Sequence, residues 1–468
     1  MDALQHCFPP NLRQFLNELP ETLDETYEQI LKGINKAQKD NAHRLLQCLT
    51  VAARPLRVEE LAELLAFDFQ ASSSGGIPTL KEDWRWEDQE EAVLSTCSSL
   101  ITIVPNGDSR VVQFSHFSVK EYLTSPRLAR SSHGDVSRFH IDLESAHTIM
   151  AQACLATLFR LEEHAGNSDA NESPLVAYAA RYWVAHARFD KVSPRVRDGI
   201  DDLFDISKSH FTAWLRVHDI DERWAFFSYS STNGTGSPLY YAAFCGFYDL
   251  AEHLIMKHPE QVNARGGLNL SPLPAALYKR HFHVANLLYR HGAVVNVQDS
   301  IMDTPLNMAS ASGHVDTMRW LLDHGADANA QNSTRWTPLH DAVNNMHLDA
   351  VRVLLEHNAN INSQNVNDDT PLYLLLTSGF SPEGNVVDFV RRLLEHGADA
   401  NIAGHLHSTA LHLASSRGWL EVSRLLLSYG AKVDEKDEKG RTPFQVAASK
   451  GHDDVTKLLL EYGAVPQP

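Results

Sequence analysis

The chain has 468 residues, room for roughly three domains of about 150 residues each, and 43% apolar residues supply enough material for hydrophobic cores, which excludes wholesale disorder. It carries 41 basic and 59 acidic side chains, a formal net charge of −18 at pH 7. A chain of this charge repels phosphate backbones and anionic lipid, so we expect no nucleic-acid partner and no membrane partner.

The five cysteines are far apart in sequence, and none forms the close pair of a zinc site or a redox dithiol (Cys7, Cys48, Cys97, Cys154 and Cys245). We expect reduced, mostly buried thiols and no metal. The N-terminus lacks the pattern of a signal peptide, and no stretch approaches 18 consecutive apolar residues. These features predict an intracellular protein, in the cytoplasm or the nucleus.

Residues 1–40 are expected to form a helical segment, and residues 41–130 a compact domain of helices and strands. The apolar residues have helical spacing over 42–53, and the spacing is broken at Pro55 and resumes over 58–67, which predicts two helices. A Ser/Gly-rich loop is expected at 71–76, and a third helix over 87–100. Alternating apolar residues at 101–104 and 111–114 flank Asn106-Gly107, a strong hairpin signal. Three helices followed by a hairpin predict a winged helix.

Charge argues against DNA as the ligand of this domain. The third helix would have to enter the major groove, but it begins with Glu87-Asp88-Gln89-Glu90-Glu91 and contains no Lys or Arg. The expected tip of the wing offers only Arg110. Four carboxylates against phosphates would be repulsive, so we expect no DNA binding.

A helical connector is predicted over residues 141–230. Residues 147–161 and 175–187 are strongly apolar at helical spacing, and 196–215 continue the pattern more weakly. Trp183, Trp214 and Tyr182 are expected to lie in its core.

The last part of the chain, residues 233–468, repeats one short anchor seven times. The anchor is a hydroxyl residue followed by proline, or once alanine, and an apolar residue. Its second positions (238, 272, 305, 338, 371, 410 and 443) are separated by 34, 33, 33, 33, 39 and 33 residues. The six extra residues of the fifth unit fall between Leu376 and Val390 and are expected to loop out between two helices.

Each unit also repeats its interior, as the third unit illustrates. Thr304 can cap a helix that starts with proline, and Gly313 can end this helix in a left-handed conformation. A second helix would bury Leu321 and Leu322, and Gly325 would open the turn into the next unit. The repeat therefore predicts stacked pairs of helices.

This pattern resembles the ankyrin repeat, whose T-P-L-H-x-A signature is matched most fully by residues 337–342 and 409–414. The resemblance implies a mainly α protein, in which the small α/β winged helix and the connector are followed by an α-solenoid of about seven repeats. It also implies a protein-binding surface of loop tips and first-helix faces. The sequence departs from the pattern where Arg280 and Met346 replace the helix-ending glycine.

Ten of the 25 histidines share three positions of the repeat, which explains them without a metal. They are His281, His314, His347 and His452 at one position, His291, His324, His357 and His396 at another, and His340 and His412 at the third.

The segment 114–123, F-S-H-F-S-V-K-E-Y-L, has two interpretations. Ser118 and Glu121 have the spacing of a capping box, which would start a helix that carries Tyr122 and Leu123 into the core. Alternatively, F-x-H-x-S-x-x-E-Y-L resembles the winged-helix signature of NACHT-type signal-transduction ATPases, whose histidine senses the β-phosphate of bound ADP. That resemblance implies a nucleotide-sensing role for His116.

Flanking segments extend the resemblance to fungal NACHT-ankyrin proteins. Residues 19–27, L-P-E-T-L-D-E-T-Y, look like the helix that follows the nucleotide domain in those proteins; residues 1–5 resemble the helix before it, and 178–183 the region that precedes their repeats. The dipeptide Gly-Lys never occurs, so no P-loop is present. G-x-S-x-G and G-x-G-x-x-G are also absent, and we expect neither a cofactor nor catalysis.

The sequence thus predicts a non-enzymatic scaffold that binds a protein partner through its ankyrin surface. The alternative is the C-terminal part of a nucleotide-switched receptor whose P-loop domain lies upstream or is lost. Candidate contact residues stand immediately before anchor threonines, together with Arg335, which adjoins the strongest candidate, Trp336. The set is Asp303, Arg335, Trp336, Asp369, Ser408 and Arg441. Packing of Trp336 against the neighbouring hairpin remains an alternative role for that side chain.

Overall fold

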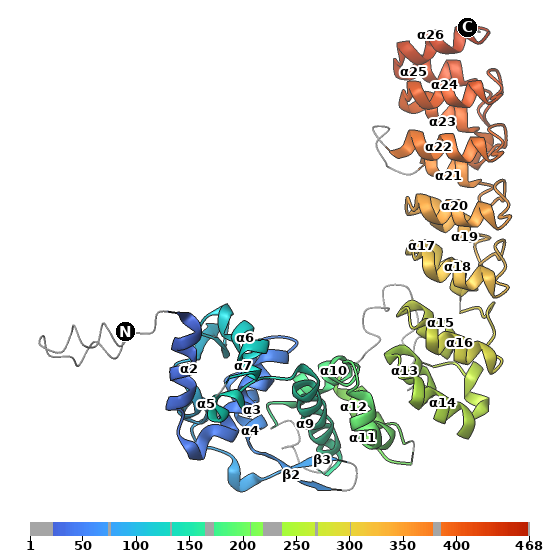
Figure 1. The fold of residues 1–468 in the computed structure, drawn as a ribbon. Helices are drawn as coiled ribbons and strands as arrows, with labels where there is room; N and C mark the ends of the chain where they lie inside the picture. The colour runs from blue at the N-terminus through green and yellow to red at the C-terminus, as the bar shows by residue number, and fades with distance from the viewer. Residues whose placement is uncertain are drawn as a thin grey trace, which may run out of the picture. The chain divides into compact units, whose positions relative to one another are not determined.

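The computed structural model describes residues 22–73, 76–131, 133–163, 173–205, 207–218, 236–266, 270–299, 301–377 and 385–466. The chain divides into two compact units, Met1–Pro238 and Leu239–Pro468. Figure 1 labels the helices and strands of both units. No helix among the described residues is both long enough and apolar enough to cross a membrane.

The N-terminal unit contains the predicted winged helix. Its three helices are α3 (Lys39–Val51), α4 (Val58–Leu65) and α5 (Gln89–Cys97), and its sheet has the strand order β1 (Leu56–Arg57), β5 (Ser109–Phe114), β4 (Ile101–Asn106). Both strand pairs are antiparallel, with Ile103 opposite Val112 in the wing. Apolar residues of α3, α4 and the sheet form its core, among them Leu45, Leu64 and Val112.

Two local expectations for this domain are corrected. Residues 71–73 of the predicted loop belong instead to the strand β2 (Phe67–Ser73), which pairs with β3 (Ile77–Leu80) in a second hairpin. Phe67 and Ile77 of this hairpin are buried in the core. The third helix starts at Gln89 instead of residue 87, because the Asp88 side chain caps it by accepting hydrogen bonds from the amides of Glu90 and Glu91.

The expected capping box at Ser118 is also wrong by two residues. Helix α6 (Phe117–Leu123) is capped by His116, whose Nδ1 accepts a hydrogen bond from the Ser118 amide at 3.2 Å. Tyr122 and Leu123 are buried, as expected. The Ser118 hydroxyl lies 2.7 Å from the Tyr27 hydroxyl, which ties α6 to α2 (Leu23–Gly33).

The described residues of the connector contain four helices. They are α9 (Leu143–Glu163), α10 (Val176–Ala187), α11 (Arg197–Leu203) and α12 (His210–Val217). Helix α9 packs against α3, α10 and β3. Trp183 and Trp214 are fully buried at a ring distance of 5.4 Å, and the Trp214 indole donates a hydrogen bond to the Ala180 carbonyl. Tyr182 is only half-buried.

The remaining elements of this unit are short. Among the described residues of this unit, two further helices are α7 (Pro126–Ala129) and α8 (Gly134–Ser137), and three 3-10 turns are η3 (Lys36–Gln38), η4 (Glu82–Trp84) and η6 (Ser193–Val196).

The C-terminal unit is a stack of helix pairs, seven among the described residues, and Figure 1 shows the pairs following one another in sequence order. The first helices are α13 (Pro238–Cys245), α15 (Pro272–Tyr278), α17 (Pro305–Ala311), α19 (Pro338–Asn344), α21 (Pro371–Thr377), α23 (Ala410–Arg417) and α25 (Pro443–Lys450). The second helices are α14 (Tyr248–Lys257), α16 (Phe282–Arg290), α18 (Val315–Asp323), α20 (Leu348–Glu356), α22 (Asn385–Glu395), α24 (Leu420–Ser428) and α26 (Asp453–Glu461). In the described part of this unit, two 3-10 turns accompany them, η8 (Pro259–Asn263) and η10 (His405–His407).

The anchor residues start the first helices as the sequence predicts. Thr304, Thr337, Thr409 and Thr442 each form a capping box with the residue three positions later. In two of these boxes that residue is a histidine, whose Nδ1 lies 2.8 Å from the threonine hydroxyl. Proline at the first helical position costs no hydrogen bond, because that amide has no partner inside the helix.

The ends of the first helices need a left-handed residue, and most units supply glycine. Gly313 has φ +67°. Arg280 and Met346, which replace the glycine, both adopt φ +59°, so the fold imposes the conformation on them. In the second helix Leu321 is fully buried, whereas Leu322 is only half-buried, which corrects the expectation for that residue. Most of the predicted insertion, residues 378–384, lies outside the described residues.

Candidate partner-binding surface

Most of the described hairpins between repeats are shaped by one acidic or amide side chain. In four units this residue accepts hydrogen bonds from the amides two and four positions later; the four are Asp299, Asn332, Asn365 and Asp437. The turn also needs a left-handed residue just before the candidate position, such as Arg335 at φ +58°. The hairpin thereby fixes the backbone of the candidate contact residues.

The structure separates the first three candidates by exposure. Arg335 is exposed at the tip of its hairpin. Trp336 is half-buried, with its ring 6.0 Å from that of His340 on α19. Asp303 is half-buried and accepts a hydrogen bond from Asn332 Nδ2 at 2.8 Å, and burial raises its pKa above the usual range. Trp336 therefore divides its surface between its own repeat and solvent.

Asp369 forms a hydrogen bond with the next hairpin along the stack. Its side chain is only 6% exposed, and Oδ1 accepts a hydrogen bond from the His405 amide at 3.0 Å. In the hairpin of the sixth unit, Gly404 stands where other units carry the turn-forming Asp or Asn. A Cβ at Gly404 would lie 2.7 Å from Asp369 Oδ1 and 2.6 Å from the Tyr373 ring, so this close approach requires glycine.

The sixth hairpin consequently has its own shape. Leu406 and His407 both have positive φ, at +59° and +52°, and Leu406 is 52% exposed. The Tyr373 hydroxyl donates a hydrogen bond to the His405 carbonyl at 3.0 Å, which fastens this hairpin to α21. The result is an exposed leucine on a firmly held loop.

A cavity of about 460 Å³ lies where the hairpins of the fifth, sixth and seventh units meet α21 and α23. Three candidates, Asp369, Ser408 and Arg441, line it together with apolar Leu406 and Leu413. The remaining lining residues are Asn367, Tyr373, Thr377, His405, Asp437, Glu438 and Lys439. The structure thus brings half of the candidate set to one mixed polar and apolar hollow.

Charge in this hollow is largely balanced within the repeats. Arg441 is exposed, but its Nε and Nη2 donate to Asp437 Oδ2 at 2.9 and 2.7 Å. The pair lowers the pKa of Asp437, although burial acts in the opposite direction as the largest single influence. A ligand in this hollow would therefore contact the Arg441 guanidinium, which Asp437 fixes in position, next to apolar side chains.

Sequence reasoning missed Asp341, which follows the T-P-L-H anchor on α19. It is half-buried, and its Oδ2 accepts a hydrogen bond from Asn307 Nδ2 at 2.9 Å. Burial raises the pKa of Asp341 to about 8, with the nearby Asp303 acting in the same direction. The sequence did offer an indication of Asp341. It comes directly after the T-P-L-H anchor, at a position whose residue varies from repeat to repeat.

The repeat histidines bond to neighbouring repeats. His340 Nε2 lies 3.1 Å from the Asp369 carbonyl and His412 Nε2 3.0 Å from the Arg441 carbonyl. Burial lowers the pKa of His340 to about 4. Across the described ranges, no group of three or more His, Cys, Asp or Glu side chains is placed to hold a metal ion.

His116, the nucleotide-sensing candidate, is exposed in the N-terminal unit. Its Nδ1 serves α6, and its ring lies 4.3 Å from that of Phe117, which is 72% exposed. Within the part of the chain that the structure describes, Nε2 makes no hydrogen bond. The side chain can therefore cap a helix and still present one ring nitrogen to a ligand.

Family models match a segment of each unit. Residues 273–365 and 374–467 match the model "Ankyrin repeats (3 copies)", and residues 27–136 match "GPI inositol-deacylase, winged helix domain". A curated relative, "Azaphilone pigments biosynthesis cluster protein L" of Monascus ruber, is 32% identical over 294 residues, which cover 58% of this chain and 60% of the relative. The match therefore spans less than two thirds of that protein.

Two solved structures are also similar. The ankyrin repeat domain of Bcl-3 is 30% identical with a TM-score of 0.43, covering 47% of this chain and 98% of that domain. An ankyrin repeat domain from Acinetobacter baumannii AYE is 33% identical with a TM-score of 0.39, covering 42% of this chain and 98% of that domain.

Proposed function

We propose that this chain, in which a winged-helix domain is followed by ankyrin repeats, is a non-enzymatic scaffold that binds a protein partner along its repeat surface. Ankyrin repeats are protein-interaction domains, and a rigid stack presents an extended surface to a partner. The observation that carries the proposal is the hollow at the last three hairpins, where Leu406 stands exposed beside Ser408 and Arg441. A hollow that combines apolar side chains with a polar rim is typical of an interface.

The same proposal gives the chain no catalytic role, no cofactor and no nucleic-acid ligand. Its support is the absence of P-loop, nucleophile-elbow and dinucleotide motifs from the sequence. On the winged helix, Arg110 of the wing pairs with Glu90 of α5, so its charge is not available to a phosphate. Four cysteines are free and buried, namely Cys48, Cys97, Cys154 and Cys245. Because free thiols are typical of a reducing compartment, we place the protein in the cytoplasm or nucleus.

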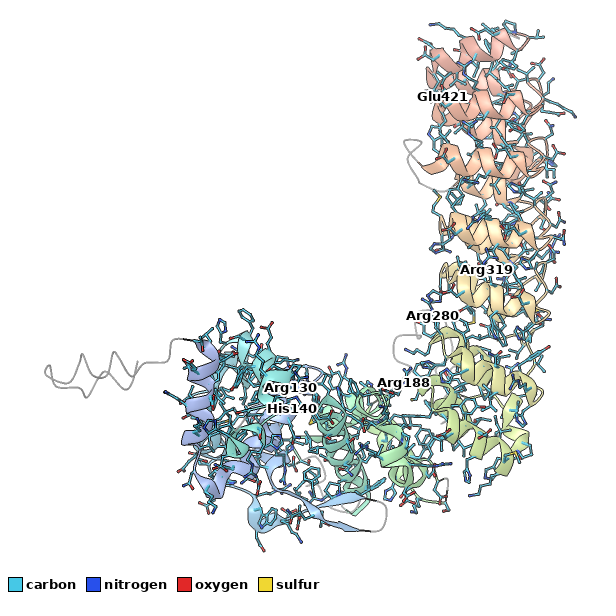
Figure 2. The ribbon with its side chains drawn as sticks, in the orientation of Figure 1. Arg130, His140, Arg188, Arg280, Arg319 and Glu421 are labelled. Atoms are coloured by element: carbon cyan, nitrogen blue, oxygen red, sulfur yellow. The ribbon has the colours of Figure 1, made fainter. Side chains whose placement is uncertain are left out.

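Proximity labelling in the source organism tests the scaffold proposal with two surface variants. One changes Arg335 and Trp336 to Ala, and the other changes Leu406 and Ser408 to Ala. The control changes Arg319 and Glu421 to Ala. These residues, labelled in Figure 2, lie on the second helices α18 and α24. We expect at least one surface variant to lose labelled partners that the control retains. Equal recovery by all three variants would refute binding through these hairpins.

A second candidate function is the C-terminal part of a nucleotide-switched receptor. The observation in its favour is the winged-helix match over residues 27–136 together with the exposed side chain of His116. This candidate predicts a reading frame upstream that encodes a P-loop, which transcript mapping would reveal. With such a domain supplied, His116→Ala should weaken ADP binding, whereas Lys120→Ala, an exposed change on the same helix, should not. Without an upstream P-loop, the receptor proposal fails and the scaffold proposal stands.

A further inference from the structure

Two tryptophans of the winged helix are exposed, in contrast to the buried tryptophans of the same unit. Trp84 is 48% and Trp86 40% exposed, whereas Trp183 and Trp214 are fully buried. They lie on the connection between β3 and α5, which includes the turn η4. Large aromatic side chains left in water contribute little to folding and are typical of contact sites.

The two indoles border a cavity of about 500 Å³. Its lining consists of Asn41, Leu65, Asp83, Trp84, Arg85 and Trp86. Leu65 is only 5% exposed and gives the cavity an apolar base, while Asp83 is exposed. The cavity therefore combines apolar and aromatic surface with a carboxylate.

The surroundings of the cavity are strongly acidic. Residues 81–91 contain six carboxylates and two basic side chains, a net charge of −4. Arg85 is already engaged, since its guanidinium donates to Glu63 Oε1 at 2.8 Å and pairs with Glu82 Oε2 at 2.8 Å. In contrast, Asp83 and Glu87 pair with no side chain in the described ranges, so their charges remain available.

The connection that carries the tryptophans is held in place at both ends. Arg85 is fixed to Glu63, a buried residue that also accepts hydrogen bonds from the Ser173 hydroxyl and the Leu175 amide. On the other side, Asp88 caps α5. A site that is ordered before binding loses less entropy on association, which favours recognition here.

We propose that this cavity, which we call the tryptophan cavity, binds an arginine-containing segment of a protein partner. An arginine side chain would stack on the indoles, and its guanidinium would face the carboxylate of Asp83, which lines the cavity. Glu87, which follows Trp86 in the chain, would add negative charge nearby. Arginine suits the site better than lysine because its planar, weakly hydrated head stacks on aromatic faces. Anionic lipid and nucleic acid are disfavoured by the same carboxylates. The site is independent of the ankyrin surface and adds a second docking point to the scaffold.

The test uses the full chain and a fluorescein-labelled octa-arginine peptide, followed by fluorescence anisotropy. The Trp84→Ala/Trp86→Ala variant keeps the charge of the protein and should bind the peptide about tenfold more weakly, or worse. The matched control is Tyr429→Ala, which removes an aromatic side chain that is 46% exposed in the C-terminal unit. It should bind like the wild type.

A second variant separates loss of the site from loss of folding. Asp83→Asn/Glu87→Gln leaves both indoles in place and should also weaken peptide binding, and labelled octa-lysine should bind the wild type less tightly than octa-arginine. Far-UV circular dichroism and the urea unfolding midpoint check the fold of each variant. Equal binding by the tryptophan variant and the control would overturn the proposal. So would tryptophan-dependent binding of phosphatidylserine vesicles or of a DNA duplex.

Discussion

The two units are stabilised in different ways. In the C-terminal unit the same bond recurs from repeat to repeat: His347 Nε2 lies 3.1 Å from the Ala311 carbonyl, and His452 Nε2 lies 3.1 Å from the Ser416 carbonyl. Each of these bonds joins neighbouring repeats. Stability in such a stack is approximately a sum of repeat and interface contributions.

The N-terminal unit depends on contacts that occur once. Glu60 is fully buried and accepts hydrogen bonds from both terminal nitrogens of Arg54 and from the Arg57 amide. His186 links His147 to the Tyr178 hydroxyl, which accepts from the Ala53 amide of the winged helix. A unit built on unique contacts has no second copy of any of them, so we expect a single change there to affect the whole unit.

The largest effect is expected from Trp214→Ala in the N-terminal unit. Trp214 is fully buried against Trp183, and its truncation should reduce the free energy of unfolding by about 3–5 kcal/mol. Urea unfolding followed by circular dichroism should show the early loss of one unit as a whole. Trp84→Ala, at an exposed tryptophan, is the control and should change stability little. If the N-terminal unit instead lost its structure gradually and locally, the proposed difference between the two units would be contradicted.

Leu354→Ala tests the repeat side of the comparison. Leu354 is fully buried on α20, and we expect a cost of about 2–5 kcal/mol. Since each repeat contacts only its neighbours, amide hydrogen exchange should accelerate in α18, α20 and the adjoining helices far more than in α13 or α26. Asp349→Ala, an exposed change on the same helix, should stay within about 0.5 kcal/mol. Uniform acceleration along the stack would show that the unit is globally cooperative.

Acid should weaken the N-terminal unit through His186. Burial, with a smaller contribution from His147, lowers the pKa of His186 to about 3 in the folded state, against about 6.5 in an unfolded chain. The unfolded state therefore binds the extra proton, and stability that is complete above pH 6.5 decreases by up to about 1.4 kcal/mol per pH unit below it. His186→Gln should flatten this dependence in urea titrations at pH 7 and pH 5. An unchanged slope would assign the acid sensitivity to other groups.

Asp341 should give the C-terminal unit a dependence of the opposite sign. Burial raises the pKa of Asp341 to about 8, so the folded state binds a proton that an unfolded aspartate releases near pH 3.9. Stability from this group is complete below pH 3.9 and is lost as the pH rises toward 8. Asp341→Asn should therefore stabilise the unit at pH 7.5 by roughly 1–2 kcal/mol in urea unfolding, while Asp349→Asn should not. If Asp341→Asn destabilised the unit, the raised pKa of Asp341 would be refuted.

The sequence predicted the repeats best because each feature there depends on residues close together. A threonine and a histidine three positions later form the capping boxes that start α19 and α23, and α19 also has a proline at its first helical position. The winged helix was also predictable from helical spacing and the Asn106-Gly107 turn, confirmed by β4 and β5.

Features that depend on distant contacts were not predictable. The glycine at position 404 makes sense only when Asp369 and Tyr373 of the preceding unit lie against it. The cap of α6 was misassigned because a histidine ring nitrogen can accept the same amide hydrogen bond as a serine hydroxyl. Exposure of Trp84 was likewise hidden, since the composition of a segment does not say which tryptophans the core leaves outside.

The smallest effect concerns a departure from the repeat pattern and has the opposite direction to a core truncation. Met346 ends α19 with φ +59°, a conformation that costs a residue with a Cβ roughly 1 kcal/mol. Met346→Gly should therefore stabilise the C-terminal unit by about 0.5–1 kcal/mol in urea unfolding. Arg280 is a poorer choice, because its ion pair with Asp316 would be lost.

The matched control is Gly313→Ala, at the equivalent position of the preceding repeat. There φ is +67°, and an added Cβ would lie 2.7 Å from the His347 ring, so the change should destabilise the unit. Opposite signs for the two substitutions would show that the repeat geometry, and not the residue found at the position, sets the left-handed conformation. A loss of stability in Met346→Gly would instead mean that the half-buried methionine side chain contributes more by packing than its backbone costs.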